Sequence, residues 1–196
     1  EKTVSVIHSV ITGARITFSR GPQYFIEDLR LARPTLMLAV PRIWERMLAA
    51  VNSRPEQPGN SDSFAPVSPT SEERAAKVRE FLGLDQAVCF ISGGAICPPY
   101  VKREFHRVGI EISDFYGQTE ILPLTYQRGG DDSNESVGTV APGFEVRIGD
   151  GGEIMGRGPG MALGYFADQD RTAATFRDGW VHTGDKGAFD ASGCLY

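Results

Sequence analysis

Few cysteines, no excess of basic residues and no long apolar run set the first limits on this 196-residue sequence. Its three cysteines, Cys89, Cys97 and Cys194, are odd in number and lack CxxC spacing, which argues against a disulfide framework and against a zinc site. A reducing cytoplasm is the simpler environment for such a chain. No apolar run approaches the length of a membrane-spanning helix, and the first residues show no signal-peptide pattern. We therefore expect a cytoplasmic protein.

The charge balance limits the partners. The formal net charge is -5, and no basic stripe stands out that could neutralise a run of phosphates. Nucleic acid is therefore not an expected partner, whereas a single nucleotide held by backbone amides and one metal ion is compatible with this charge. With 41% hydrophobic and 23% charged residues, the chain can bury a core as one domain or as part of a larger one.

Helical and strand patterns alternate up to about residue 124. The apolar spacing predicts helices over 4–11, 24–31, 41–51, 70–82 and 98–108, and strands over 15–18, 35–40, 87–91 and 110–112. Residues 52–71 are rich in Pro, Ser, Asn and Gly, which indicates a mobile loop. In the helix over 98–108, Val101 and Phe105 share the apolar face, and Lys102 is assigned to the polar face. Residues 1–124 are therefore predicted to form an α/β layer with a parallel sheet.

Beyond about Leu124, helical periodicity gives way to short strand patterns separated by glycines. The strands are expected over 137–140, 144–148, 153–157, 180–183 and 187–189, and residues 150–152 (DGG) are typical of a hairpin turn. Residues 125–196 are therefore predicted to form a β-rich subdomain beside the α/β layer. The fold class is α/β, a parallel sheet with helices plus this β-rich part.

Two glycine-containing segments follow neighbouring predicted strands and are separated by the length of one helix. The first is Ser92 to Ala95 (SGGA), and the second is Ser113 to Glu120 (SDFYGQTE), which we interpret as turns. In open α/β sheets a ligand lies in the crevice at the carboxyl ends of the strands, so both segments are expected to border one site. We therefore treat them as the centre of a candidate binding site.

The second segment offers four kinds of contact to a nucleotide with a hard cation. Tyr116 supplies a flat apolar face, Gly117 permits close backbone approach, Thr119 supplies a hydroxyl and Glu120 an anionic oxygen. Further along, Asp185 follows His182 in a predicted turn, where its carboxylate could accept hydrogen bonds from two ribose hydroxyls.

Each of these interpretations has a plainer alternative. Glycine pairs such as Gly93 and Gly94 are usually turns without a ligand. Glu120 could be a surface or helix-start carboxylate, and His182 a structural histidine that only makes hydrogen bonds. The residues alone leave these alternatives open.

Four motifs occur in the order and spacing of the adenylate-forming superfamily, which the chain resembles over most of its length. They are Ser92 to Ala95 (SGGA), Tyr116 to Glu120 (YGQTE), Gly152 to Pro159 (GEIMGRGP) with Gly164 and Tyr165, and Gly179 to Asp185 (GWVHTGD). The stretches Arg33 to Thr35 and Val40 to Glu45 are similar to the long-chain fatty acyl-CoA synthetase branch. The resemblance implies the fold of the superfamily's N-terminal domain, here a central part of it.

The resemblance also implies a reaction: a carboxylate attacks the α-phosphorus of ATP to give an acyl-adenylate and pyrophosphate, and the thiol of CoA then takes the acyl group. The acid would be a long-chain fatty acid, with ATP and Mg²⁺ as cofactors and CoA as co-substrate. The catalytic residues would be Thr119, contacting the phosphate, and Glu120, holding Mg²⁺. Tyr116 would stack on adenine and Asp185 would hold the ribose, and the nucleotide and acyl group would also be lined by Gly93, Gly94, Ala95, Phe115 and Gly117.

The superfamily pattern includes two elements without a counterpart in this sequence, a Ser/Thr/Gly-rich phosphate loop ending in lysine and a catalytic lysine in a C-terminal domain. The resemblance therefore implies a chain that is inactive by itself and a longer parent that catalyses the reaction, associated peripherally with membranes. Two alternatives are a nucleotide-binding module without catalysis and a fatty acyl-AMP ligase that loads a carrier protein.

Overall fold

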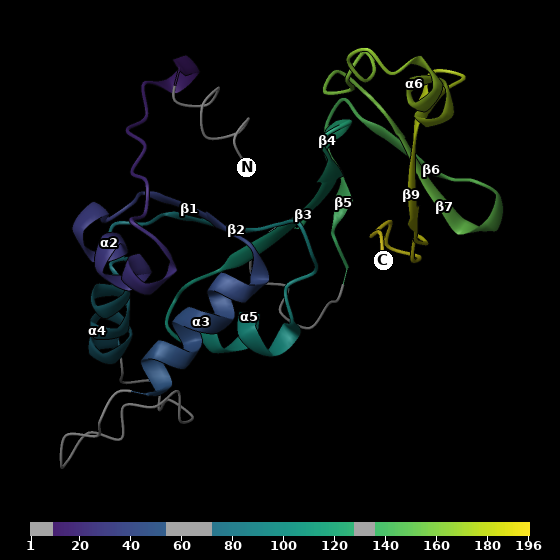
Figure 1. The fold of residues 1–196 in the computed structure, drawn as a ribbon. Coiled ribbons are helices and arrows are strands. Elements are labelled where there is room, and N and C mark those ends of the chain that lie inside the picture. The colour runs from purple at the N-terminus through teal and green to yellow at the C-terminus, as the bar shows by residue number, and fades with distance from the viewer. Residues whose placement is uncertain (1–9, 54–71, 128–135) are drawn as a thin grey trace.

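The computed structural model describes residues 10–53, 72–127 and 136–196. These residues form two sheets, one of five strands in the order β1-β2-β3-β4-β5 and one of four strands in the order β6-β7-β9-β8. In Figure 1 the helices α2 to α5 gather around the β1 to β3 end of the first sheet, and α6 accompanies the second sheet. No helix within the described parts is long and apolar enough to cross a bilayer.

The first sheet is mixed. Strands β1 (Leu36–Ala39), β2 (Cys89–Ser92) and β3 (Ile112–Gln118) run parallel, whereas β4 (Ile121–Tyr126) and β5 (Thr139–Val140) are antiparallel to their neighbours. The strands predicted over 35–40 and 87–91 are confirmed. The one predicted over 110–112 begins at its last residue and continues to Gln118, because β4 turns back and supplies hydrogen-bonding partners for its second half.

Four helices pack on this sheet and bury one core. They are α2 (Phe25–Ala32), α3 (Pro41–Asn52), α4 (Glu72–Leu82) and α5 (Pro99–His106). Helices α3 and α5 each begin with a proline at the first helical position. The fully buried Trp44 ring stands edge-on to Phe105 with centroids 5.3 Å apart. These four helices were predicted from their apolar spacing. The predicted helix 4–11 and loop 52–71 fall largely outside the described residues.

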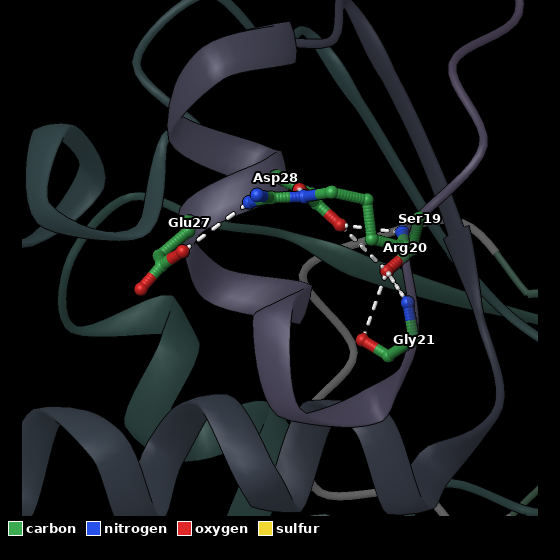
Figure 2. A network of polar contacts seen from close by, with 5 residues as sticks. All are labelled: Ser19, Arg20, Gly21, Glu27 and Asp28. Atoms are coloured by element: carbon green, nitrogen blue, oxygen red, sulfur yellow. Dashed lines mark hydrogen bonds and ion pairs between the residues drawn. The ribbon is translucent and has the colours of Figure 1, made fainter.

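The strand predicted over 15–18 is wrong, because this segment has no regular structure and its Phe18 side chain is 78% exposed. The chain is tied instead to α2 through the buried carboxylate of Asp28, as Figure 2 shows. Arg20 Nε donates to Asp28 Oδ1 over 2.6 Å, and the Ser19 hydroxyl donates to Oδ2 over 2.9 Å. Side-chain hydrogen bonds from Ser19 and Arg20 to α2, and not strand pairing, therefore hold this part of the chain.

Lys102 lies on the opposite face from the one predicted. Its side chain is 1% exposed, and its Nζ lies 2.5 Å from Oδ2 of Asp114 on β3 and 2.6 Å from Oε1 of Gln127. A buried charge requires a charged or polar partner; here one partner lies on β3, and the other is the residue that directly follows β4 (Ile121–Tyr126). The prediction of a solvated lysine is wrong, because the apolar spacing within one helix does not reveal partners that are distant in the sequence.

The second sheet is antiparallel throughout. Its strands are β6 (Glu145–Ile148), β7 (Glu153–Arg157), β8 (Phe176–Arg177) and β9 (Trp180–Lys186). The predicted DGG turn is present as a short helical turn, η2 (Asp150–Gly152), between β6 and β7. The strand predicted over 187–189 is only a bridge between Phe189 and Leu195. Helix α6 (Gln169–Thr175) was not predicted; its N-cap Asp168 accepts a hydrogen bond from the Arg171 amide.

The two sheets meet through β4. Ile121 and Leu124 of β4 and Val181 of β9 are fully buried in one apolar cluster. A methyl group at Gly156 of β7 would lie 2.4 Å from Leu124 Cδ2, so the two strands approach closely. The predicted division of the chain at residue 124 therefore falls inside a strand that joins both sheets, and the division stays a prediction.

Candidate functional site

The first glycine segment follows β2 and contacts β3. The Gly93 amide donates to the carbonyl oxygen of Ala39 over 3.3 Å, and Gly94 adopts a φ of 84°, which favours glycine. A methyl group at Gly93 would lie 2.3 Å from Cε1 of Phe115, so the missing side chain makes room for that ring. Gly94 and Ala95 are exposed. The structure thus brings Phe115 onto the first glycine turn, as the parallel pairing of β2 and β3 requires.

The second segment is mostly strand rather than turn, which corrects the expectation from its sequence. β3 runs to Gln118 with an irregularity between Tyr116 and Gln118, and only Thr119 and Glu120 form the turn into β4. A methyl group at Gly117 would lie 2.9 Å from the carbonyl oxygen of Ile121, so the close backbone approach that requires glycine is made by the chain itself.

Tyr116 and Asp185, which are distant in sequence, meet directly. The Tyr116 hydroxyl donates to Oδ2 of Asp185 over 2.7 Å, and Nε2 of Gln118 donates to the same oxygen over 2.8 Å. Gln118 also donates to the carbonyl oxygen of Thr183 over 2.9 Å, which ties β3 to β9. Burial, together with the bond to Asp185, raises the pKa of the Tyr116 phenol, so it donates at neutral pH. Sequence reasoning missed Gln118, whose only signal was its place within the YGQTE motif.

Asp185 lies on β9, which hydrogen bonds to the Glu153 side chain of β7 hold in place. β9 extends through the predicted turn to Lys186, with Gly184 at a φ of 74°. Glu153 of β7 accepts the Gly184 amide over 3.1 Å and lies 2.9 Å from Nδ1 of His182. The hydrogen bond from His182 lowers the pKa of the Glu153 carboxyl. His182 is therefore engaged in positioning the strand, as expected for a structural histidine.

Glu120 is the third element of the site and is half-buried, whereas Thr119 is exposed. The Tyr165 hydroxyl donates to Oε1 of Glu120 over 2.5 Å, and the Glu120 carbonyl oxygen accepts the Ala162 amide over 2.8 Å. Within the described ranges, no group of three or more His, Cys, Asp or Glu residues could hold a metal ion. A single carboxylate fits Mg²⁺, which takes most of its ligands from phosphates and water.

The fold matches part of the N-terminal domain of adenylate-forming enzymes. The structure of O-succinylbenzoate CoA synthetase from Bacillus subtilis, in complex with ATP and magnesium, matches 97% of this chain and 37% of its own, with a TM-score of 0.69 and 23% identity. Residues 2–166 match the family described as AMP-binding enzyme. The chain belongs to this family.

Relatives in this family act on different acids. A 3-(7a-methyl-1,5-dioxo-octahydro-1H-inden-4-yl)propanoyl:CoA ligase from Rhodococcus jostii is 49% identical over 109 residues, covering 53% of this chain and 21% of the relative. A human long-chain-fatty-acid CoA ligase is 30% identical over 222 residues, covering 97% of this chain and 32% of the relative. The chain thus spans about a fifth to a third of the length of these relatives.

Proposed function

We propose that this chain is the nucleotide-binding part of an acid-thiol ligase, which activates a fatty acid with ATP and passes the acyl group to CoA. The observation that carries the proposal is the meeting of Tyr116, Gln118 and Asp185. Two donors hold Oδ2 of Asp185, and none of the described residues donates a hydrogen bond to its Oδ1. An aromatic ring beside an oriented, exposed carboxylate suits the adenine and the two ribose hydroxyls of a nucleotide.

The proposed reaction has two steps. A carboxylate oxygen of the acid attacks the α-phosphorus of ATP, the bond to the bridging oxygen breaks, and acyl-adenylate and pyrophosphate form. The sulfur of CoA then attacks the acyl carbon, and AMP leaves. The residues of this chain contribute mostly by orientation and charge placement. Tyr116 and Asp185 orient the nucleoside, Gly93, Gly94, Ala95, Phe115 and Gly117 border it, and Thr119 contacts phosphate.

Glu120 would hold Mg²⁺ in this proposal. When bound, Mg²⁺ would neutralise charge on the ATP phosphates. The turn between β3 and β4 places the carboxylate two residues beyond Gln118, which contacts Asp185. The end of β3 and the turn after it therefore carry both Tyr116, the proposed adenine contact, and the proposed metal ligand.

A long-chain fatty acid is the proposed substrate because the human long-chain-fatty-acid ligase aligns with nearly the whole chain. The segment Val40 to Glu45 supports the same branch, although its Trp44 is buried in the core against Phe105. The named relatives are CoA ligases, which supports CoA over a carrier protein as the acceptor.

Binding calorimetry with ATP and Mg²⁺ on this chain tests the nucleotide site. We expect weak, Mg²⁺-dependent binding, and Asp185→Ala should weaken it more than tenfold, because charge-assisted hydrogen bonds contribute about 1.5 to 3 kcal/mol each. The mutant should also lose the preference for ATP over 2′-deoxy-ATP. Asp170→Ala, a change to an exposed aspartate on α6, serves as the control and should keep the wild-type affinity.

Two results would contradict the proposal in different ways. If the wild-type chain shows no Mg²⁺-dependent nucleotide binding, the proposed function is wrong. If the wild-type chain binds ATP but Asp185→Ala prefers ATP over 2′-deoxy-ATP as strongly as the wild type does, the proposed ribose contact is wrong. Asp185 then serves only to join β3 to β9.

A further inference from the structure

Glu120 has a hydrogen-bonding partner far along the chain. The Tyr165 hydroxyl donates to Glu120 Oε1 over 2.5 Å, across a separation of 45 residues. The two residues belong to different parts of the fold, since Glu120 lies in the β3–β4 turn and Tyr165 lies between β7 and α6. A bond of this length to a carboxylate is a charge-assisted one, which is stronger than a bond between neutral groups.

Helix α6 and its surroundings fix the Tyr165 ring. The Tyr165 amide donates to Oγ1 of Thr172 over 2.9 Å, and that hydroxyl donates to the carbonyl oxygen of Asp168 over 2.7 Å. The ring stands edge-on to Phe176 with centroids 5.8 Å apart, and the Arg171 guanidinium lies 5.6 Å from its centre. Backbone, ring face and ring edge are therefore all held, so the hydroxyl has a defined direction.

The backbone of Glu120 is held by the same segment. The Ala162 amide donates to the Glu120 carbonyl oxygen over 2.8 Å, and Met161 forms a bridge with Ile121. A glutamate side chain in a turn would otherwise sample several rotamers, and restricting it to one when a metal binds costs conformational entropy. The contacts from residues 161–165 remove much of that freedom before any ligand arrives.

We propose that Tyr165 is a positioning residue, whose hydroxyl holds the Glu120 carboxylate in the orientation that binds Mg²⁺ with a nucleotide. This inference rests on the proposed function. A carboxylate has about four lone-pair sites, so it can accept the Tyr165 bond and still coordinate a metal ion. Partners that orient a metal ligand in this way commonly change metal affinity when they are removed.

Tyr165→Phe tests the proposal because it removes only the hydroxyl and keeps the ring against Phe176. In calorimetry on this chain, the apparent affinity for ATP with Mg²⁺ should fall about tenfold or more. The affinity for AMP without metal should stay unchanged, because AMP does not require Glu120. Tyr100→Phe is the matched control, since it removes the 2.9 Å hydrogen bond from Tyr100 to Glu45 and should change neither affinity.

A double-mutant cycle shows whether Tyr165 acts through Glu120. In a Glu120→Gln background, Tyr165→Phe should change Mg²⁺-dependent ATP affinity by less than about twofold, since the group it orients is gone. Circular dichroism melting of each variant checks that the fold is retained.

The possible outcomes separate the proposal from its rivals. Unchanged or tighter binding of ATP with Mg²⁺ by Tyr165→Phe would overturn the positioning role. An equal loss of AMP and Mg²⁺-ATP affinity would also overturn it, because it would indicate a purely structural contact. If the wild-type chain shows no Mg²⁺-dependent binding, the proposed function fails and this inference fails with it.

Discussion

The buried pair of Lys102 and Asp114 gives the sharpest test of the packing. Their side chains are 1% and 2% exposed and their charged atoms lie 2.5 Å apart. Lys102→Met fills a similar volume but leaves the Asp114 carboxylate without its cation. Breaking a buried pair in this way costs about 3 to 5 kcal/mol, which is a large share of the roughly 5 to 15 kcal/mol that stabilises an ordinary domain.

Urea unfolding followed by circular dichroism measures this cost. The midpoint should fall strongly in Lys102→Met, while the double variant Lys102→Met, Asp114→Leu should recover most of the free energy of unfolding, because no buried charge then lacks a partner. Lys77→Met on α4 is the control; its side chain is exposed, and the change should stay within about 0.5 kcal/mol.

The cost should depend on pH. Burial raises the pKa of the Asp114 carboxyl above its ordinary 3.8, even with Lys102 beside it. A raised folded-state pKa means that the folded chain binds more protons than the unfolded one above pH 3.8, so this group lowers stability as pH rises. Without Lys102 the pKa should rise further, so the loss in Lys102→Met should be larger at pH 8 than at pH 5. A loss below about 1 kcal/mol at both pH values would refute the buried pair.

Two further predictions concern packing elsewhere. Burial raises the pKa of the Cys97 thiol to about 12, so Ellman's reagent at pH 8 should modify Cys89 and Cys194 in the folded chain and reach Cys97 only after unfolding; rapid labelling of all three would contradict its burial. Gly138→Ala should lower the melting temperature far more than Gly193→Ala. Both glycines have a similar positive φ, but only at Gly138 would a methyl group meet backbone, 2.0 Å from the Tyr126 carbonyl oxygen, and equal effects would contradict this difference.

Local patterns predicted the elements that depend on neighbours in the sequence. The apolar spacing of Trp44, Met47 and Val51 was enough for α3, because residues three and four apart share a helix face. The strand over 153–157 and the DGG turn before it were also predicted, since both the alternation and the turn chemistry lie within a few residues. The motifs SGGA, YGQTE and HTGD likewise indicated the superfamily and the candidate site residues.

Contacts between distant segments decided the rest. Lys102 looked like a surface residue until β3 placed Asp114 beneath it, and the YGQTE motif looked like a turn until β4 paired with its first half. Tyr165 and Glu120 are 45 residues apart, so no local pattern could join them. Periodicity and propensity describe what one segment can do, whereas burial, strand pairing and shared hydrogen bonds depend on which segments meet. For this chain, the sequence by itself determined most of the local elements and the residue types of the candidate site. Only the tertiary structure determined which partners orient Asp185 and Glu120.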